Sequence, residues 1–307
     1  MNSGELFDRE SLPRVRGKSL ESLAYSRQRR DQLLEMFDGE VPSSIMRKRV
    51  RTDNADPALG SYTETQGQYV ADDASKLERE AFSISNAGVA SGALSLFPQN
   101  VGRAILLLYS EPGDVVVDPF AGHNSRMDLC AKEGRHYVGY DISDRFMAYN
   151  KERAKYLRSV LPDIEIVLHH QDSRSLSKTR DGFGDFTITS PPYYDIEDYG
   201  DEAAQLGKCP SYESFLDDLT MVMRENFRVL KPGAFAAWFV NDFRRDKKFF
   251  PYHIDTVERM RSAGFVFHDI CIVDLGSSFR EAFVNQIVET RILPKRHEYG
   301  LIFRKPS

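Results

Sequence analysis

The sequence of 307 residues has few cysteines, and they are far apart. Cys130, Cys209 and Cys271 form no Cys-x-x-Cys pair, so their spacing predicts neither a disulfide framework nor a zinc site, and we expect no bound metal. No apolar stretch approaches the length of a membrane span, and the polar N-terminus lacks the apolar core of a secretory signal. The expectation is a reduced, cytoplasmic location with no membrane partner.

The chain also lacks a basic charge balance. Its 41 Lys and Arg stand against 46 Asp and Glu, for a formal net charge of −5. The composition as a whole therefore does not indicate nucleic-acid binding, and only local basic patches could provide it. Hydrophobic residues make up 41% of the sequence, which is enough for a packed core. The length suggests one large domain, or a domain with an extension.

Residues 1–85 differ in character from the rest of the chain. They are polar and short of strand-like runs, and they carry basic clusters at 14–18, 27–30 and 47–51 that acidic residues nearly cancel. One amphipathic helix is expected over 19–37 and a loop or linker over 53–69. We predict a mainly helical or irregular N-terminal extension. Its basic clusters are either solvated surface or contacts to DNA phosphates or a partner.

Residues 86–307 read as a second unit, in which short apolar runs alternate with segments of helical period. The strand-like runs are 115–117, 137–140, 164–168, 186–188, 234–240, 265–273 and 299–303. A helix over 102–109 is expected to direct Ile105, Leu106 and Leu108 inward. The alternation predicts an α/β fold with a doubly wound, mostly parallel sheet of seven strands.

Polar residues follow four of the predicted strands. Asp118, Asp141, Asp172 and Ser190 each lie at or just past a strand end. Doubly wound sheets bind ligands beyond the carboxyl ends of their strands, at the switch in strand order. We therefore predict that these four side chains line one ligand site. Each acid taken singly is also a common helix cap or turn former.

The loops after the first two strands indicate a nucleoside ligand. Gly122 allows the backbone to approach a ligand closely, and the helix start after it favours an anionic or carboxylate group. Asp141 is placed to accept hydrogen bonds from ribose hydroxyls, and Asp172 could bond an adenine amino group. The G-x-G-x-x-G fingerprint and a Walker lysine are absent. A nucleoside without a pyrophosphate therefore fits better than NAD or ATP.

Two motifs together resemble those of the DNA amino-methyltransferases, which have a class I S-adenosylmethionine-dependent fold. They are Asp118-Pro119-Phe120-Ala121-Gly122 after the first strand and Ser190-Pro191-Pro192-Tyr193 after the fourth. The resemblance covers about 95–307 and includes Phe97-Pro98-Gln99-Asn100. It departs from the family at His123-Asn124-Ser125-Arg126, where the second glycine of the first motif is missing.

The resemblance implies S-adenosylmethionine as cofactor and a site in two parts. The residues expected to bind the cofactor are Phe97, Asn100, Asp118, Pro119, Phe120, Ala121, Gly122, Asn124, Ser125, Asp141, Ile142, Asp172 and Ser173. The residues expected to act on the target base are Ser190, Pro191, Pro192 and Tyr193.

The second motif predicts methylation of an exocyclic amino group, whose lone pair is conjugated with the ring. Ser190 and the carbonyl of Pro191 would accept its two N–H bonds and aim the lone pair at the sulfonium methyl, so positioning supplies most of the rate. Duplex stacking hides the amino group, so we expect the base to be flipped out and stacked on Tyr193. By analogy with the family, serine at the first position favours cytosine N4 over adenine N6.

Sequence readout needs side chains that reach base edges. The candidates, for which ordinary solvated loops are the alternative, are the N-terminal basic clusters together with Asn241, Arg244, Arg245, Lys247, Lys248, Arg280, Asn285, Gln286, Arg291 and Lys295.

Two other functions fit the same residues. One is an RNA base methyltransferase, because related Pro-Pro-aromatic loops occur there. The other is a non-catalytic DNA-binding subunit that keeps the fold, which the departure at His123-Asn124 motivates. The expected partners are double-stranded DNA, a restriction endonuclease or other defence partner, and a second copy of the chain. The expected host is a bacterium, an archaeon or a phage.

Overall fold

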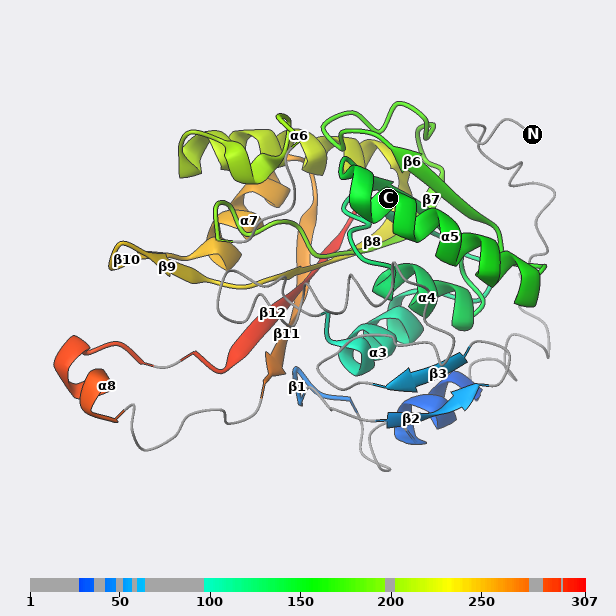
Figure 1. Ribbon diagram of the computed structural model, residues 1–307, viewed down its shortest axis with the longest axis horizontal. Helices are drawn as coiled ribbons and strands as arrows, with labels where there is room; N and C mark the ends of the chain where they lie inside the picture. Colours follow the sequence, from blue (N-terminus) through cyan, green and yellow to red (C-terminus); the bar gives the residue numbers. More distant parts are fainter. Residues whose placement is uncertain are drawn as a thin grey trace.

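A computed structural model describes residues 28–35, 42–47, 52–56, 60–63, 97–196, 202–275, 284–293 and 295–307 of the chain. Most of the predicted N-terminal extension lies outside these residues, as do Arg280 and the side chains of Asn285 and Gln286. The centre of the molecule is one twisted sheet with helices packed on both faces (Figure 1).

The central sheet has eight strands within the described residues. In spatial order they are β1 (Ile45–Arg47), β11 (Val266–Asp274), β12 (His297–Arg304), β8 (Leu230–Val240), β7 (Gly184–Thr189), β4 (Val115–Asp118), β5 (His136–Asp141) and β6 (Ile166–His170). Strand β12 runs antiparallel to both of its neighbours, and the other pairs are parallel. The predicted doubly wound, mostly parallel sheet is confirmed. The strand beyond the predicted seven is β1.

Helices and two small sheets complete the described structure. The helices are α3 (Gln99–Tyr109), α4 (Ser125–Lys132), α5 (Asp144–Val160), α6 (Tyr212–Val229), α7 (Tyr252–Ser262), α8 (Val284–Thr290) and the short 3-10 helix η3 (Leu206–Lys208), and residues 28–35 are also helical. The small sheets pair β2 (Thr52–Asp56) with β3 (Gly60–Thr63) and β9 (Phe243–Arg245) with β10 (Lys248–Phe250). No helix in the described part of the chain is long and apolar enough to cross a membrane.

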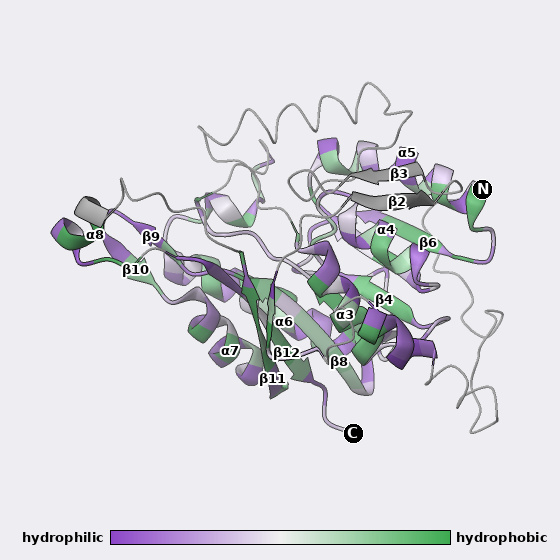
Figure 2. Cartoon of the chain, turned by 90° about the horizontal axis from the view of Figure 1, so that it is seen from below, coloured by the Kyte–Doolittle hydropathy of each residue, from purple (hydrophilic) through white to green (hydrophobic). Residues whose placement is uncertain are grey.

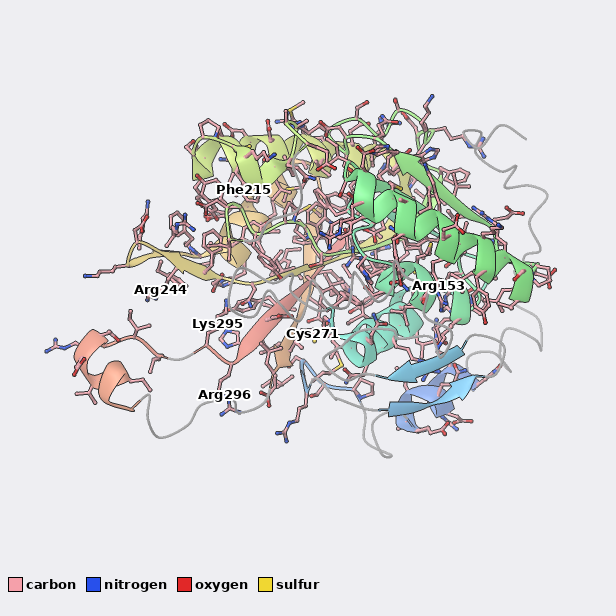
Figure 3. All side chains as sticks on the ribbon, viewed as in Figure 1. Arg153, Phe215, Arg244, Cys271, Lys295 and Arg296 are labelled. Carbon is pink, nitrogen blue, oxygen red and sulfur yellow. The ribbon has the colours of Figure 1, made fainter. Side chains whose placement is uncertain are left out.

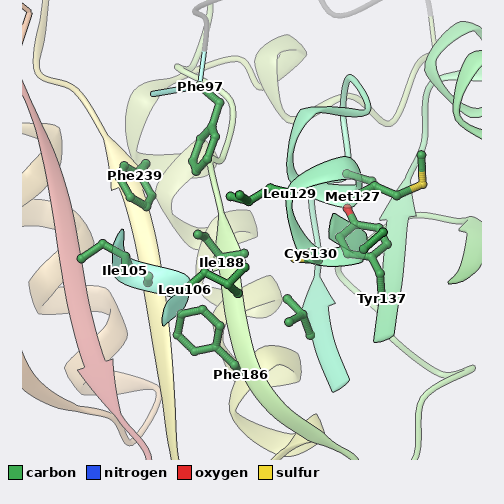
Figure 4. Close-up of a cluster of buried hydrophobic side chains, with 14 of the residues drawn as sticks. Phe97, Ile105, Leu106, Met127, Leu129, Cys130, Tyr137, Phe186, Ile188 and Phe239 are labelled. Carbon is green, nitrogen blue, oxygen red and sulfur yellow. The ribbon is translucent and has the colours of Figure 1, made fainter. Parts of the chain in front are cut away.

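Strand β4 shows why the sheet has a hydrophobic core on each face. Val115, Val116 and Val117 are all fully buried. Val116 packs into the cluster with α3, α4 and α5, whereas Val115 and Val117 belong to a cluster on the other face. A central parallel strand is covered on both sides, so its side chains are apolar in both directions. Figure 4 shows part of the first cluster, and Figure 2 shows hydrophobic residues concentrated in the central strands.

Two described parts of the N-terminal extension, β1 and the helical segment 28–35, contact the rest of the fold. Strand β1 lies at the edge, where the amide of Ile272 donates to the carbonyl of Ser44 over 2.6 Å. The side chain of Asn100 donates to the carbonyl of Arg47 over 2.9 Å, and Leu33 packs against the core. The predicted boundary between residues 85 and 86 falls outside the described residues and stays a prediction.

One inward residue of α3 was predicted wrongly. Ile105 and Leu106 are buried as expected, but Leu108 is 49% exposed and Leu107 is buried in its place. Leu108 lies one turn beyond Ala104, on the same face of the helix, because residues four apart share a face. It belongs to the last turn of α3, where the described residues do not cover it.

Candidate active site

The strand order reverses between β4 and β7, and the two predicted motifs meet there. Strands β5 and β6 continue the sheet on one side of β4, whereas β7 and β8 lie on the other. Doubly wound sheets hold their ligands at such a switch. The hydroxyl of Thr189, at the end of β7, donates to the carboxylate of Asp118, at the end of β4, over 2.6 Å. The structure therefore brings the first and fourth strand ends into direct contact.

Asp118 is fully buried and engaged on both carboxylate oxygens. Besides Thr189, Oδ1 accepts the amide of Phe120 at 3.1 Å. Oδ2 accepts Nε of Arg126 at 2.7 Å and the hydroxyl of Tyr137 at 2.8 Å. Burial, and then the Asp118 charge, raise the pKa of Tyr137, so its hydroxyl acts as a donor. Asp118 thus holds the loop after β4 against β7, and its predicted contact with the cofactor stays a prediction.

Asp141 and Gly122 hold the second pair of loops together. Gly122 has φ +48°, a conformation that glycine adopts without strain. Its amide donates to Oδ2 of Asp141 over 2.7 Å, and the amide of Ser143 donates to Oδ1 over 2.8 Å. Burial raises the pKa of Asp141 to about 6, opposed by these two backbone donors. Each carboxylate oxygen keeps a second acceptor site, which suits ribose hydroxyls.

The loop after β6 is tied to the same site. The hydroxyl of Ser173 donates to the carbonyl of Pro119. Asp172 is partly exposed and forms an ion pair with Arg174, with 2.6 Å between Nη2 and Oδ2. Arg174 also pairs with Asp218. The carboxylate predicted to meet an adenine amino group is therefore already paired within the protein, and its role towards the cofactor stays a prediction.

Phe97 and Asn100, two of the residues predicted to bind the cofactor, contact the hydrophobic core and β1. The ring of Phe97 is buried and packs edge-on against Phe239, with 4.9 Å between centroids. The guanidinium of Arg126 lies 5.3 Å from the centre of the same ring. The amide of Asn100 holds the carbonyl of Arg47 in β1. No bond within the described residues links either side chain to the loop after β4.

The remaining predicted cofactor residues surround the turn at Gly122. Ala121 donates its amide to the carbonyl of Tyr140 over 2.8 Å, Ser125 begins α4, and the carbonyl of Ile142 accepts a nitrogen of His170 at 2.9 Å.

Two buried amide oxygens near this turn suggest that a ligand contacts it. The side chain of Asn150 donates to the carbonyl of Gly122 over 2.7 Å, and that of Asn124 donates to Asp128 over 2.9 Å. The side-chain oxygens of Asn124 and Asn150 are buried and have no hydrogen-bond partner within the described residues. Buried polar atoms are usually hydrogen-bonded. The turn therefore fits a ligand that carries hydrogen-bond donors, as a ribose and an amino group do.

His123 begins the stretch in which the second glycine of the first motif is missing. Its ring stacks on Tyr149 of α5, with 4.6 Å between centroids and 23° between planes. Burial, and then the charge of Arg145, lower the pKa of His123 to about 4. The imidazole is therefore neutral near pH 7, and it adds an aromatic contact rather than a charge to the loop.

The loop after β7 leaves its first polar group available. The hydroxyl of Ser190 has no hydrogen-bond partner within the described residues, and the side chain is only partly buried. The carbonyl of Pro192 accepts the hydroxyl of Tyr252 at 3.1 Å, and Tyr194 has φ +49°. Proline carries no amide hydrogen, so the Pro-Pro step stays out of the sheet ladder, and of its two carbonyls only that of Pro192 has a hydrogen-bond donor within the described residues.

Tyr193 lies in the core, and the partly buried Tyr194 packs against it. Tyr193 is 7% exposed and packs edge-on against Tyr252, with 6.2 Å between centroids. Tyr194 packs against Tyr212 and Phe215 at 5.8 and 5.5 Å. The predicted stacking of a base on Tyr193 stays a prediction.

Sequence reasoning missed two supports of this loop. Tyr252 opens α7 and reaches the carbonyl of Pro192, and Asp195 pairs with Arg245 over 3.1 Å. No motif marks either residue, because both act across long sequence separations. Asn241, a predicted readout candidate directly after β8, has a buried side-chain oxygen with no partner within the described residues. The carboxylate oxygen Oδ1 of Asp195, which does not face Arg245, is also buried without a partner there.

Comparison with known proteins gives the following matches. A family model described as DNA methylase matches residues 42–152 and 185–307. The orphan methyltransferase M.BamHII of Bacillus amyloliquefaciens is 33% identical over 61 residues, 20% of this chain and 23% of that protein. The type II methyltransferase M.Cfr9I of Citrobacter freundii is 29% identical over 69 residues, 22% of this chain and 23% of that protein. The matched stretches thus span less than a quarter of these two relatives.

One solved structure is similar over a longer range. A SAM-dependent methyltransferase from Methanosarcina mazei covers 69% of this chain and 99% of its own, with 16% identity and a TM-score of 0.46.

Proposed function

The chain belongs to the DNA methylase family, and on that premise we propose that it methylates an exocyclic amino group of a base in DNA, cytosine N4 in preference to adenine N6. The main support for this proposal is the hydrogen bonding of the Asp118 carboxylate. The carboxylate accepts the amide of Phe120 and the hydroxyl of Thr189. The loop predicted for the cofactor and the loop predicted for the target base are therefore fixed to one group.

S-adenosylmethionine, the cofactor of this family, supplies an electrophilic methyl group on a positively charged sulfur. Asp141 would accept the ribose hydroxyls, because its two oxygens are held by Gly122 and Ser143 and keep free acceptor sites. The side-chain oxygens of Asn124 and Asn150 offer two further acceptors next to the same turn. These contacts would hold the cofactor before the target base arrives.

Ser190 and Pro191 would position the amino group. The hydroxyl of Ser190 has no internal partner, and the Pro192 carbonyl is already taken by Tyr252. The Pro191 carbonyl is thus the second acceptor that the loop offers. Two acceptors on the two N–H bonds pull the nitrogen towards tetrahedral geometry and direct its lone pair. Holding reactants in such a geometry supplies a large part of the rate.

The proton leaves after the methyl group has been transferred. The product is an ammonium group attached to the ring, and it is acidic enough to lose its proton to water because deprotonation restores the conjugation of the nitrogen lone pair. A general base is therefore not needed before attack. Flipping of the base out of the duplex gives the amino group access to Ser190. The choice of cytosine rests on Ser190 alone, since both target bases carry an amino group of the same kind.

The test uses the full chain, labelled S-adenosylmethionine and duplex DNA of mixed sequence, with the same length of RNA in parallel. After digestion to nucleosides we expect label in N4-methyldeoxycytidine. Label in N6-methyldeoxyadenosine would move the proposal to adenine, and label in RNA alone would replace it with RNA methylation. Bound cofactor with no modified nucleoside on any substrate would contradict methyl transfer and favour a non-catalytic subunit.

Partners other than DNA stay predictions. A restriction endonuclease is the first to test, and M.Cfr9I is named a type II methyltransferase. A homodimer, a cytoplasmic location and a bacterial, archaeal or phage host likewise stay predictions. Copurification of the tagged chain from its native host would test the endonuclease partner and the homodimer.

A further inference from the structure

A basic hairpin extends from the body of the molecule directly after β8. Strands β9 and β10 pair antiparallel, with Arg245 opposite Lys248 and Phe243 opposite Phe250. Figures 1 and 3 show the hairpin reaching away from the central sheet, with Arg244 far out along it. Residues 243–250 contain four basic residues and one acidic residue, in a chain whose net charge is −5. The hairpin is thus a local exception to the acidic balance of the chain.

The base of the hairpin is packed by aromatic rings, whereas its outer part is in solvent. The rings of Phe243 and Phe250 stack with 4.9 Å between centroids, and Tyr212 of α6 contacts Phe250 at 4.8 Å. Residues 244–249 are exposed. The exposed residues of the hairpin are therefore attached to the protein through its aromatic base.

Three of the four cations have no acidic partner within the described residues. Arg244 lies over the ring of Phe249 at 5.0 Å, and Lys248 lies over Phe250 at 4.9 Å. Lys247 sits in the turn. Arg244, Lys247 and Lys248 are therefore positive charges that stay available for an anion.

The fourth cation, Arg245, has an acidic partner. Arg245 pairs with Asp195 over 3.1 Å, and Asp195 lies five residues after Ser190. The hairpin is therefore joined to the loop that carries the predicted target-base residues. The segment before β12 contacts the start of the hairpin as well. The ammonium of Lys295 donates a hydrogen bond to the carbonyl of Asp242 over 2.5 Å.

We propose that the β9–β10 hairpin binds the DNA backbone beside the target base, with Arg244, Lys247 and Lys248 on phosphates and Arg245 fastening the hairpin to the catalytic loop. The inference rests on the proposed function, because that function supplies the DNA. Strands of three residues reach about 10 Å. The major groove, about 12 Å wide and about 8.5 Å deep, admits a two-stranded ribbon of that length.

The experiment measures duplex DNA affinity of the full chain as a function of salt, with cofactor present. For phosphate contacts, log Kobs falls linearly with log salt, with a slope of about 0.9 per contact. The variant Arg244→Gln, Lys247→Gln, Lys248→Gln should have a slope shallower by about 2.7, and at least about 100-fold weaker binding at low salt. Its melting temperature and its cofactor affinity should equal those of the wild type.

Two control variants separate the effect of the location of the cations from the effect of net charge. Lys151→Gln, Lys155→Gln, Arg261→Gln removes three exposed cations from α5 and α7 and should leave the slope within about 0.5 of the wild type. Arg245→Gln should lower turnover and leave most of the slope, since this residue is paired with Asp195.

Four results would overturn the inference. An unchanged slope in the hairpin variant contradicts the hairpin inference and leaves the proposed function standing, provided that the wild type still methylates DNA. An equal loss of slope in the α5 and α7 control shows that only net charge matters, and a slope change on RNA but not on DNA assigns the hairpin to another partner. A wild-type chain that binds cofactor but shows no salt-dependent DNA binding removes the inference together with the proposed function.

Discussion

The two halves of the proposed site are held together by different forces. The cofactor half, the loops after β4, β5 and β6, is joined by polar bonds from Asp118, Asp141 and Ser173. The target half, residues 190–196 and 241–250, is packed by aromatic rings, including Tyr212 against Phe250. Its first polar residue, Ser190, has no partner within the described residues.

The backbone differs in the same way. The cofactor half places Gly122 at its left-handed position, with φ +48°. The target half places Tyr194, Asp246 and Lys247 at φ 49°, 49° and 65°. Side chains other than glycine, asparagine and aspartate rarely adopt this conformation, which carries a cost. The backbone of the proposed cofactor half is therefore free of this cost within the described residues, whereas that of the proposed target half carries it.

The largest effect should come from breaking the polar bonds of the cofactor half at Asp118. Asp118→Ala leaves Arg126 buried without its counter-charge, and losing one member of a buried ion pair costs about 3–5 kcal/mol. Urea unfolding measures the loss. Asp163→Ala, on an exposed loop, should change stability by less than about 0.5 kcal/mol. A loss of that small size at Asp118 would contradict its central role.

The second effect concerns the target half. Ser190→Ala should lower turnover about 100-fold, because one of the two acceptors that position the amino group is lost. Cofactor affinity and melting temperature should not change, since Ser190 has no internal bond. Single-turnover kinetics and calorimetry measure the two quantities. Ser159→Ala, on the exposed face of α5, is the matched control. Weaker cofactor binding in Ser190→Ala would mean that the two halves are not separate.

The third effect is a pH dependence that belongs to the cofactor half. The pKa of Asp141 is raised to about 6 by burial, and ribose hydroxyls donate best to the charged carboxylate. Cofactor affinity should therefore be constant above pH 7 and fall as the pH drops through 6. One proton gives about a 10-fold loss between pH 7 and pH 5. Calorimetry over this range tests it. Asp141→Asn should bind more weakly and lose the dependence, and an unchanged profile in that variant would rule out Asp141.

The smallest effect tests the backbone contrast directly. Gly122→Ala should lower stability by about 1 kcal/mol, because the added Cβ meets no atom closer than 3.7 Å and only the conformation is costly. Lys247→Gly should raise stability by up to about 1 kcal/mol, since glycine relieves the strained turn. Thermal unfolding of both variants should give shifts of opposite sign. Shifts of the same sign would show that the halves do not differ in strain.

Sequence alone determined the strand ends and the fold class. An apolar run covered on both faces has to end where the chain leaves the sheet, so a polar residue after Val115–Val117 marks the end of β4 in the sequence itself. The same logic located Asp141 and Ser190.

Tertiary structure decided which groups pair. Asp118 accepts bonds from residues 8, 19 and 71 positions away, and sequence patterns report only near neighbours. The edge strand β1 is three residues long, and it is a strand only because β11 lies next to it. The sequence did not predict the hairpin, because its turn residues Asp246 and Lys247 are not the Asn-Gly or Asp-Gly pair that marks a tight hairpin. Aromatic packing at its base stabilises the turn that the local sequence does not favour.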